Sequence, residues 1–117
     1  VGLDIEAIFT SHTATDLAGS IIDCHEQQIL QISPVPFPLA LTLAFSAKES
    51  VYKAFSTQAT ELPGFASAQI TAITATQLTL QIMPSFSASL AGRNINVYWT
   101  PRDNNIITLC PSSPSGS

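Results

Sequence analysis

The chain has 117 residues and a formal net charge of −4 at pH 7. Its length suffices for one compact domain and excludes two, and its hydrophobic content of 45% excludes disorder over most of its length. The acidic balance argues against a nucleic acid as partner. Charged residues make up only 10% of the chain, against about 25% in typical soluble domains, so we expect part of the surface to be covered by another body.

Membrane-spanning and disulfide-rich classes are also excluded. The uncharged stretch at residues 67–92 is interrupted by Pro84 and by many polar residues, so no transmembrane segment is expected. Two cysteines cannot build a disulfide scaffold, which favours a cytoplasmic location. Because the chain opens directly on a strand pattern and without Met, we expect a piece of a longer protein.

The N-terminal third predicts a strand, two helical pieces and a linker. Residues 1–8 alternate with the period of two that a strand needs. Residues 13–31 predict helix in two pieces, capped at Thr15 and at Asp23. Residues 33–38 contain three prolines, which predicts a stiff extended linker.

The next segment predicts the longest helix. Residues 39–45 form a short apolar run, interpreted as a strand or an extended segment, that leads into Ser46. Ser46 is a predicted N-cap, and Glu49 stands where it would complete a capping box. The helix is expected to end near Thr57.

The C-terminal half predicts an antiparallel meander. A turn is expected at residues 62–64. After it we predict strands at 67–75, 77–83, 94–100 and 106–110, a hairpin loop at 101–105 and a disordered tail at 111–117. This order predicts a single α+β domain over residues 1–110, in which an antiparallel sheet of about three to four strands packs with a long helix.

Asp4 and Glu6 are the first pair of candidate functional residues in the chain. They stand at positions i and i+2 of the predicted strand, so their carboxylates share a face and repel each other. A solvated face makes this harmless, whereas a partly buried face requires a cation to keep both ionised. A solvated strand edge and a metal site both stay open on these two residues alone.

A second group lies at the predicted helix start. Glu49 and Lys53 are four positions apart, which is compatible with an ordinary surface ion pair. However, Lys48 and Lys53 are two of only four basic residues, and a helix start offers unpaired N–H groups that suit a phosphate. With Asp4 and Glu6, Glu49 makes three carboxylates for a hard ion such as Mg²⁺, and Lys53 could offset charge on a departing phosphate. This combination is typical of phosphoryl-type transfer.

Two segments resemble the signature motifs of a known family. Residues 1–6 (VGLDIE) and 45–53 (FSAKESVYK) are similar to the two motifs of 4′-phosphopantetheinyl transferases, in the same order and at a fitting separation. Residues 36–50 resemble the enterobactin-synthase-type branch, whose chains contain two similar halves. The resemblance covers residues 1–55 by motif and the later strands by pattern. It implies the C-terminal half of a pseudo-dimeric fold.

The resemblance also implies a reaction. Coenzyme A donates its phosphopantetheine arm to a serine hydroxyl of an apo carrier protein, and 3′,5′-ADP leaves. Asp4, Glu6 and Glu49 would bind Mg²⁺, and Glu49 would accept the serine proton directly or through a bound water. Lys53 would contact the phosphate nearest to the leaving nucleotide. Lys48 would support phosphate or carrier binding.

The sequence departs from the two-half branch at one motif. The family's Ser-His pair, which belongs before the first strand, is absent, and Ser11-His12 follows that strand and is interpreted as a surface turn. We therefore expect the missing N-terminal half, or a self-association interface, to complete the coenzyme A pocket. A non-catalytic carrier-binding or assembly module and a different Mg²⁺-phosphate enzyme are the alternatives.

The remaining candidates have structural interpretations. Cys24, His25 and Cys110 lack the paired spacing of a zinc site, so free thiols are expected. Three aromatic residues are expected to fill the core and a face between the two halves: Phe86, Tyr98 and Trp99.

Overall fold

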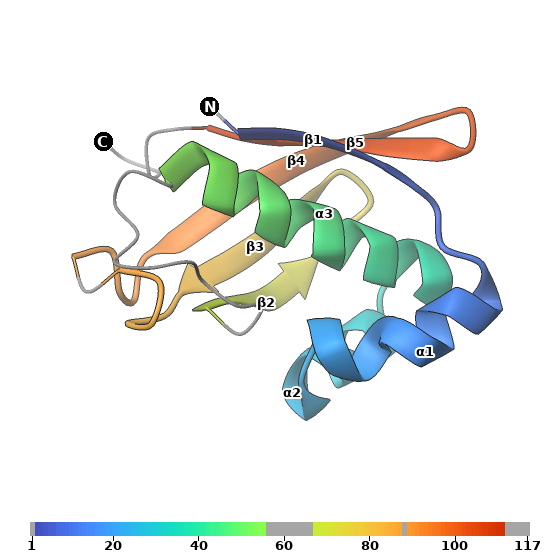
Figure 1. Ribbon diagram of the computed structural model, residues 1–117, viewed down its shortest axis with the longest axis horizontal. Helices are drawn as coiled ribbons and strands as arrows, with labels where there is room; N and C mark the ends of the chain where they lie inside the picture. The colour runs from blue at the N-terminus through green and yellow to red at the C-terminus, as the bar shows by residue number, and fades with distance from the viewer. Residues whose placement is uncertain (1, 56–66, 88, 112–117) are drawn as a thin grey trace.

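An antiparallel sheet forms one layer of the molecule, and a long helix crosses one of its faces (Figure 1). The computed structural model describes residues 2–55, 67–87 and 89–111. The strands are β1 (Gly2–Ala7), β2 (Ala68–Ile73), β3 (Gln77–Ile82), β4 (Asn94–Arg102) and β5 (Asn105–Cys110). Their order in the sheet is β1–β5–β4–β3–β2. The predicted α+β class is confirmed, with five strands in place of three to four because β1 joins the meander by pairing with β5.

Alternating apolar side chains account for the sheet. In β3, Leu78, Leu80 and Ile82 are fully buried, whereas the residues between them are only partly covered. The four strands predicted after residue 66 agree with the observed ones within two residues at each end. The hairpin loop is shorter than expected, because β4 and β5 stay paired as far as Arg102 and Asn105.

The long helix begins earlier than the sequence predicts. Helix α3 spans Phe37–Phe55, so the extended linker ends before residue 37, and the predicted strand at 39–45 is wrong. Proline is tolerated in a first helical turn, as at Pro38, and the Leu- and Ala-rich run that follows favours helix. Its residues 40–44 are all buried, since α3 packs against the sheet and also against α1 and α2 (Figure 1). Burial on all sides removes the periodicity that identifies a surface helix.

The predicted helix start at Ser46 is therefore wrong as well. Ser46 lies inside α3, so there is no capping box with Glu49 and no free helix N-terminus to attract a phosphate at this point. The Ser46 hydroxyl instead donates a hydrogen bond to Asp4 on β1.

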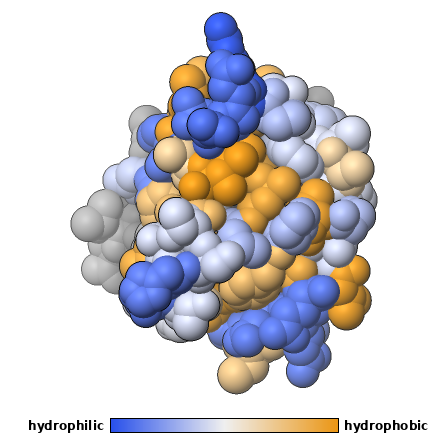
Figure 2. All heavy atoms as spheres, turned by 90° about the vertical axis from the view of Figure 1, so that its right-hand side faces the viewer, coloured by the Kyte–Doolittle hydropathy of each residue, from blue (hydrophilic) through white to orange (hydrophobic). Residues whose placement is uncertain are grey.

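Two short helices cover α3 at one end. Helix α1 (Ser11–Ile21) is capped by Thr10 rather than Thr15, and the predicted turn at Ser11-His12 is its first turn. Helix α2 (Cys24–Gln31) begins at a complete capping box formed by Asp23 and Glu26, which confirms Asp23 as a cap. Figure 2 looks at the end of the molecule that carries α1, where hydrophobic atoms stay exposed between hydrophilic ones.

Three predictions lie outside the described residues: the end of the long helix near residue 57, the turn at 62–64 and the tail from residue 112. Within the described part, the structure contains no helix with the length and apolar character needed to span a membrane.

Candidate functional site

The site begins with the close contact between β1 and α3. Gly2 is buried, and a Cβ atom added there would lie 1.8 Å from the Ser50 carbonyl oxygen. Only glycine allows the strand and the helix to approach this closely. The inward face of β1, which carries Asp4, consequently lies directly against the side chains of α3.

Asp4 occupies the centre of this contact. Its side chain is only 6% exposed, and its two oxygens have different partners. Ser46 Oγ donates to Oδ2 over 2.7 Å, and Lys53 Nζ lies 2.8 Å from Oδ1. Burial favours the protonated acid, but the hydrogen bonds from Lys53 and Ser46 outweigh it and hold the pKa of Asp4 below its ordinary value. Asp4 is thus a buried, ionised carboxylate.

Glu6 and Glu49 belong to the same electrostatic group. Burial, a hydrogen bond with Asp4 and the negative charges of Asp4 and Glu49 raise the pKa of Glu6 to about 7. The hydrogen bond to Asp4, together with the charges of Glu49 and Glu6, raises the pKa of Lys53. The structure therefore joins Asp4 to Lys53 and to Glu6 by hydrogen bonds, and the charge of Glu49 acts on Glu6 and Lys53.

The donor set of this group suits a hard divalent cation. One of its carboxylates, Asp4, contacts the Lys53 amine, and the charges of Glu6 and Glu49 act on the same amine. Mg²⁺ prefers carboxylate oxygen ligands of this kind. Among the residues that the structure describes, no three His, Cys, Asp or Glu side chains are already arranged to hold a metal ion. The Asp4 carboxylate instead accepts hydrogen bonds from Ser46 and Lys53. The chemistry and the charge of these side chains therefore suit a cation, but their coordination geometry is not preformed.

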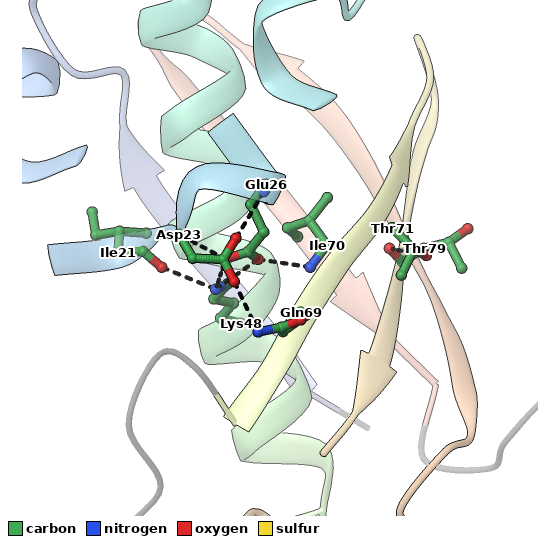
Figure 3. A network of polar contacts seen from close by, with 8 residues as sticks. All are labelled: Ile21, Asp23, Glu26, Lys48, Gln69, Ile70, Thr71 and Thr79. Atoms are coloured by element: carbon green, nitrogen blue, oxygen red, sulfur yellow. Dashed lines mark hydrogen bonds and ion pairs between the residues drawn. The ribbon is translucent and has the colours of Figure 1, made fainter. Parts of the chain in front are cut away.

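Lys48 lies in a different environment (Figure 3). Its amine is 2.9 Å from Glu26 Oε2 and donates to the Ile21 carbonyl oxygen over 2.9 Å. Both charged side chains are buried, at 3% and 1% exposure. Successive helical residues point about 100° apart, so Lys48 and its neighbour Glu49 serve different sides of α3. The structure does not bring Lys48 to the carboxylate group, and its predicted phosphate- or carrier-binding role has no support in this geometry.

The Glu26 carboxylate connects three elements around Lys48. The backbone N–H of Ile70 on β2 donates to Oε2 over 2.7 Å, and that of Asp23 donates to Oε1 over 3.1 Å. The pair therefore fastens α2 to β2 and to α3 (Figure 3). Lys48 therefore attaches α3, the helix that carries Glu49 and Lys53, to α2 and to the end of α1, and it does so away from the carboxylate group.

Sequence reasoning missed the hydroxyl groups behind Asp4. Ser46 and Ser50 stand one helical turn apart on α3, and Thr108 is the cross-strand partner of Asp4 in β5. All three are fully buried. The available signal was Thr108 itself, a polar residue at an inward position between Ile106 and Cys110, which are both buried.

The two cysteines do not contribute to a site. Cys24 is exposed and Cys110 is buried, and both are free thiols, as expected. Burial raises the pKa of the Cys110 thiol to about 12, which makes it inert at neutral pH.

Comparison with known proteins identifies the family. The 4′-phosphopantetheinyl transferase superfamily profile matches residues 1–110. Enterobactin synthase component D of Salmonella typhimurium is 61% identical over 109 residues, which are 93% of this chain and 46% of that protein. The protein of the same name from Escherichia coli O157:H7 is 38% identical over 110 residues, which are 94% of this chain and 48% of that protein. The chain thus spans about half the length of these curated relatives, and it belongs to the 4′-phosphopantetheinyl transferase superfamily.

Proposed function

We propose that this chain supplies the cation- and pyrophosphate-binding half of an enzyme that transfers 4′-phosphopantetheine from coenzyme A to a serine of an apo carrier protein. Membership of the superfamily supports the reaction class. The observation that carries the proposal is the 2.8 Å contact between Asp4 on β1 and Lys53 on α3, because it joins the two sequence motifs into one site.

Asp4, Glu6 and Glu49 are the proposed ligands of Mg²⁺. Their three carboxylates exceed the single positive charge of Lys53, and a divalent cation would balance the difference. When bound, Mg²⁺ would hold the pyrophosphate of coenzyme A and neutralise the charge that develops on it.

Lys53 and Glu49 are the proposed catalytic residues. In the reaction a bond forms between the serine oxygen and the phosphorus that carries the pantetheine arm, and the bond from this phosphorus to the oxygen of 3′,5′-ADP breaks. Glu49 accepts the serine proton, directly or through a water molecule. The Lys53 side chain is 48% exposed, so its amine can reach a phosphate from the solvent side and stabilise the leaving group.

The second half of the enzyme is the proposed occupant of the sheet face turned away from α3. Leu3, Leu109 and Tyr98 are register partners across β1, β5 and β4, and Leu3 and Tyr98 are 51% and 48% exposed. Ile5, on the same face of β1, is 56% exposed. A contiguous apolar face of this kind is typical of an interface, and the chain's length, about half that of its relatives, supports a missing half as its occupant. Tyr98 would serve this interface, whereas the partly buried Trp99 packs against the core.

A transfer assay tests the proposal. The chain is mixed with coenzyme A, Mg²⁺ and an apo carrier protein, with and without the segment of Salmonella typhimurium enterobactin synthase component D that it does not match. The carrier's mass is followed over time. We expect modification only when both halves and Mg²⁺ are present. Full turnover by the chain alone would refute the claim that it is incomplete.

A substitution separates the enzyme from a non-catalytic module. Glu49→Gln should abolish transfer while carrier binding by the two-half complex persists, and Asp16→Asn, which removes an exposed carboxylate of α1, should leave transfer unchanged. Equal transfer by Glu49→Gln and the parent would contradict the assigned role of Glu49. Carrier binding without transfer by the unsubstituted complex would support the binding-module alternative.

A further inference from the structure

A row of buried hydroxyl groups runs from β5 to Asp4 through the interface with α3. Thr108 Oγ1 lies 2.8 Å from Ser46 Oγ, and Ser46 Oγ lies 2.7 Å from Asp4 Oδ2. Ser50 Oγ contacts Thr108 Oγ1 from the other side. The exposure of Ser46, Ser50 and Thr108 is 0% each, so no solvent competes for these bonds.

The hydrogen bonds in this row have one direction. A carboxylate only accepts hydrogen bonds, so the Ser46 hydroxyl donates its single proton to Asp4. Its oxygen must then accept from Thr108, and Thr108 must accept from Ser50. Hydrogen bonds aligned in this way strengthen one another in a low-dielectric interior.

The row holds Asp4 from its buried side. Ser46 fixes Oδ2, whereas Lys53, which is half exposed, contacts Oδ1 on the other side. The Thr108 hydroxyl also lies 3.2 Å from the Ser46 carbonyl oxygen, which is a second acceptor within reach of its one proton, so Thr108 contacts both the side chain and the backbone of Ser46. Removing the Thr108 hydroxyl would take away the contact that holds Ser46 Oγ from the side opposite Asp4.

We propose that Thr108, acting through Ser46, is a positioning residue that orients the Asp4 carboxylate and thereby sets the cation affinity of the site. This inference rests on the proposed Mg²⁺-binding role of Asp4. Residues that hydrogen-bond a metal ligand commonly change metal affinity by about 10- to 100-fold when they are replaced.

Isothermal titration calorimetry of the 117-residue chain with Mg²⁺ measures the cation affinity directly and so tests the inference without an activity measurement. Thr108→Val keeps the side-chain shape but removes the hydroxyl, and it should weaken Mg²⁺ binding by about tenfold. Thr108→Ser, which keeps the hydroxyl, should restore affinity to within about twofold of the parent. Thr71→Val removes an exposed hydroxyl from β2 at the opposite edge of the sheet and should have no effect.

Each outcome decides between two claims. If Asp4→Asn abolishes Mg²⁺ binding while Thr108→Val binds like the parent, the positioning role is wrong and the metal site survives. If the parent shows no saturable binding, or Asp4→Asn does not alter it, the proposed metal site fails and the inference fails with it. Should circular dichroism show that Thr108→Val does not fold, Ser46→Ala makes the same test, because it removes the last hydroxyl before Asp4.

Discussion

Removing the charge of Glu26 should destabilise the fold strongly. The Glu26 side chain is 1% exposed, and each of its oxygens faces only donors: Lys48 and the Asp23 N–H at Oε1, and Lys48 and the Ile70 N–H at Oε2. In Glu26→Gln an amide NH₂ replaces one of these oxygens, and the buried Lys48 charge loses the opposite charge of the Glu26 carboxylate. Breaking a buried ion pair in this way costs about 3–5 kcal/mol, a large part of a typical total stability of about 5–15 kcal/mol.

The loss should depend on pH in a defined direction. Burial already lowers the pKa of Lys48 from the ordinary 10.5, and Glu26 opposes this effect. Without Glu26 the pKa falls further, so the folded state binds this proton more weakly than the unfolded state does. The loss of unfolding free energy in Glu26→Gln is therefore largest at pH values below the pKa of Lys48 in the folded state. It diminishes as the pH rises through that pKa towards 10.5, the ordinary value of lysine.

Urea unfolding followed by circular dichroism at pH 7 and at about pH 9.5 measures this effect. Adding Lys48→Met to Glu26→Gln should recover part of the loss, because the buried charge that Glu26 neutralised is removed as well. Asp16→Asn, at an exposed carboxylate, should change the free energy of unfolding by less than about 0.5 kcal/mol. A loss below about 1 kcal/mol for Glu26→Gln, or a loss equal at both pH values, would refute the reasoning.

Two further predictions follow from packing. Gly2→Ala should lower the free energy of unfolding by about 1–3 kcal/mol, because the new methyl group would meet the Ser50 carbonyl oxygen at 1.8 Å; Gly19→Ala in α1, which meets nothing within 4 Å, should instead stabilise by up to about 1 kcal/mol. Urea unfolding of both variants checks this, and a destabilised Gly19→Ala beside a neutral Gly2→Ala would contradict it. In the native chain an aromatic disulfide reagent should modify Cys24 quickly and Cys110 only after unfolding, since burial protects Cys110 and raises its pKa to about 12; equal native rates would show that Cys110 is accessible.

Periodicity predicted the parts of the fold that have one exposed face. The period-two pattern of β1 placed Asp4 and Glu6 on one side of the strand, and both belong to the site. The capping residue Asp23 was also identified, because a cap is a local interaction within a few residues. The strand boundaries after residue 66 followed from the same alternation.

The errors concern residues whose environment is set by distant parts of the chain. The segment 39–45 has no exposed face, so its apolar run could not distinguish a strand from a buried helix. For Lys48, position in the sequence did not reveal its partner, because Glu26 comes from α2, more than twenty residues earlier. Thr108 gained its role only from the pairing of β5 with β1.

A crystal structure with Mn²⁺ in place of Mg²⁺ and with coenzyme A tests the central claim most directly. Anomalous scattering locates the Mn²⁺ ion without reference to the protein coordinates. We predict one ion bound to oxygens of Asp4, Glu6 and Glu49, with the Lys53 amine near the pyrophosphate. An ion bound elsewhere, or coenzyme A held without contact to these four side chains, would contradict the account.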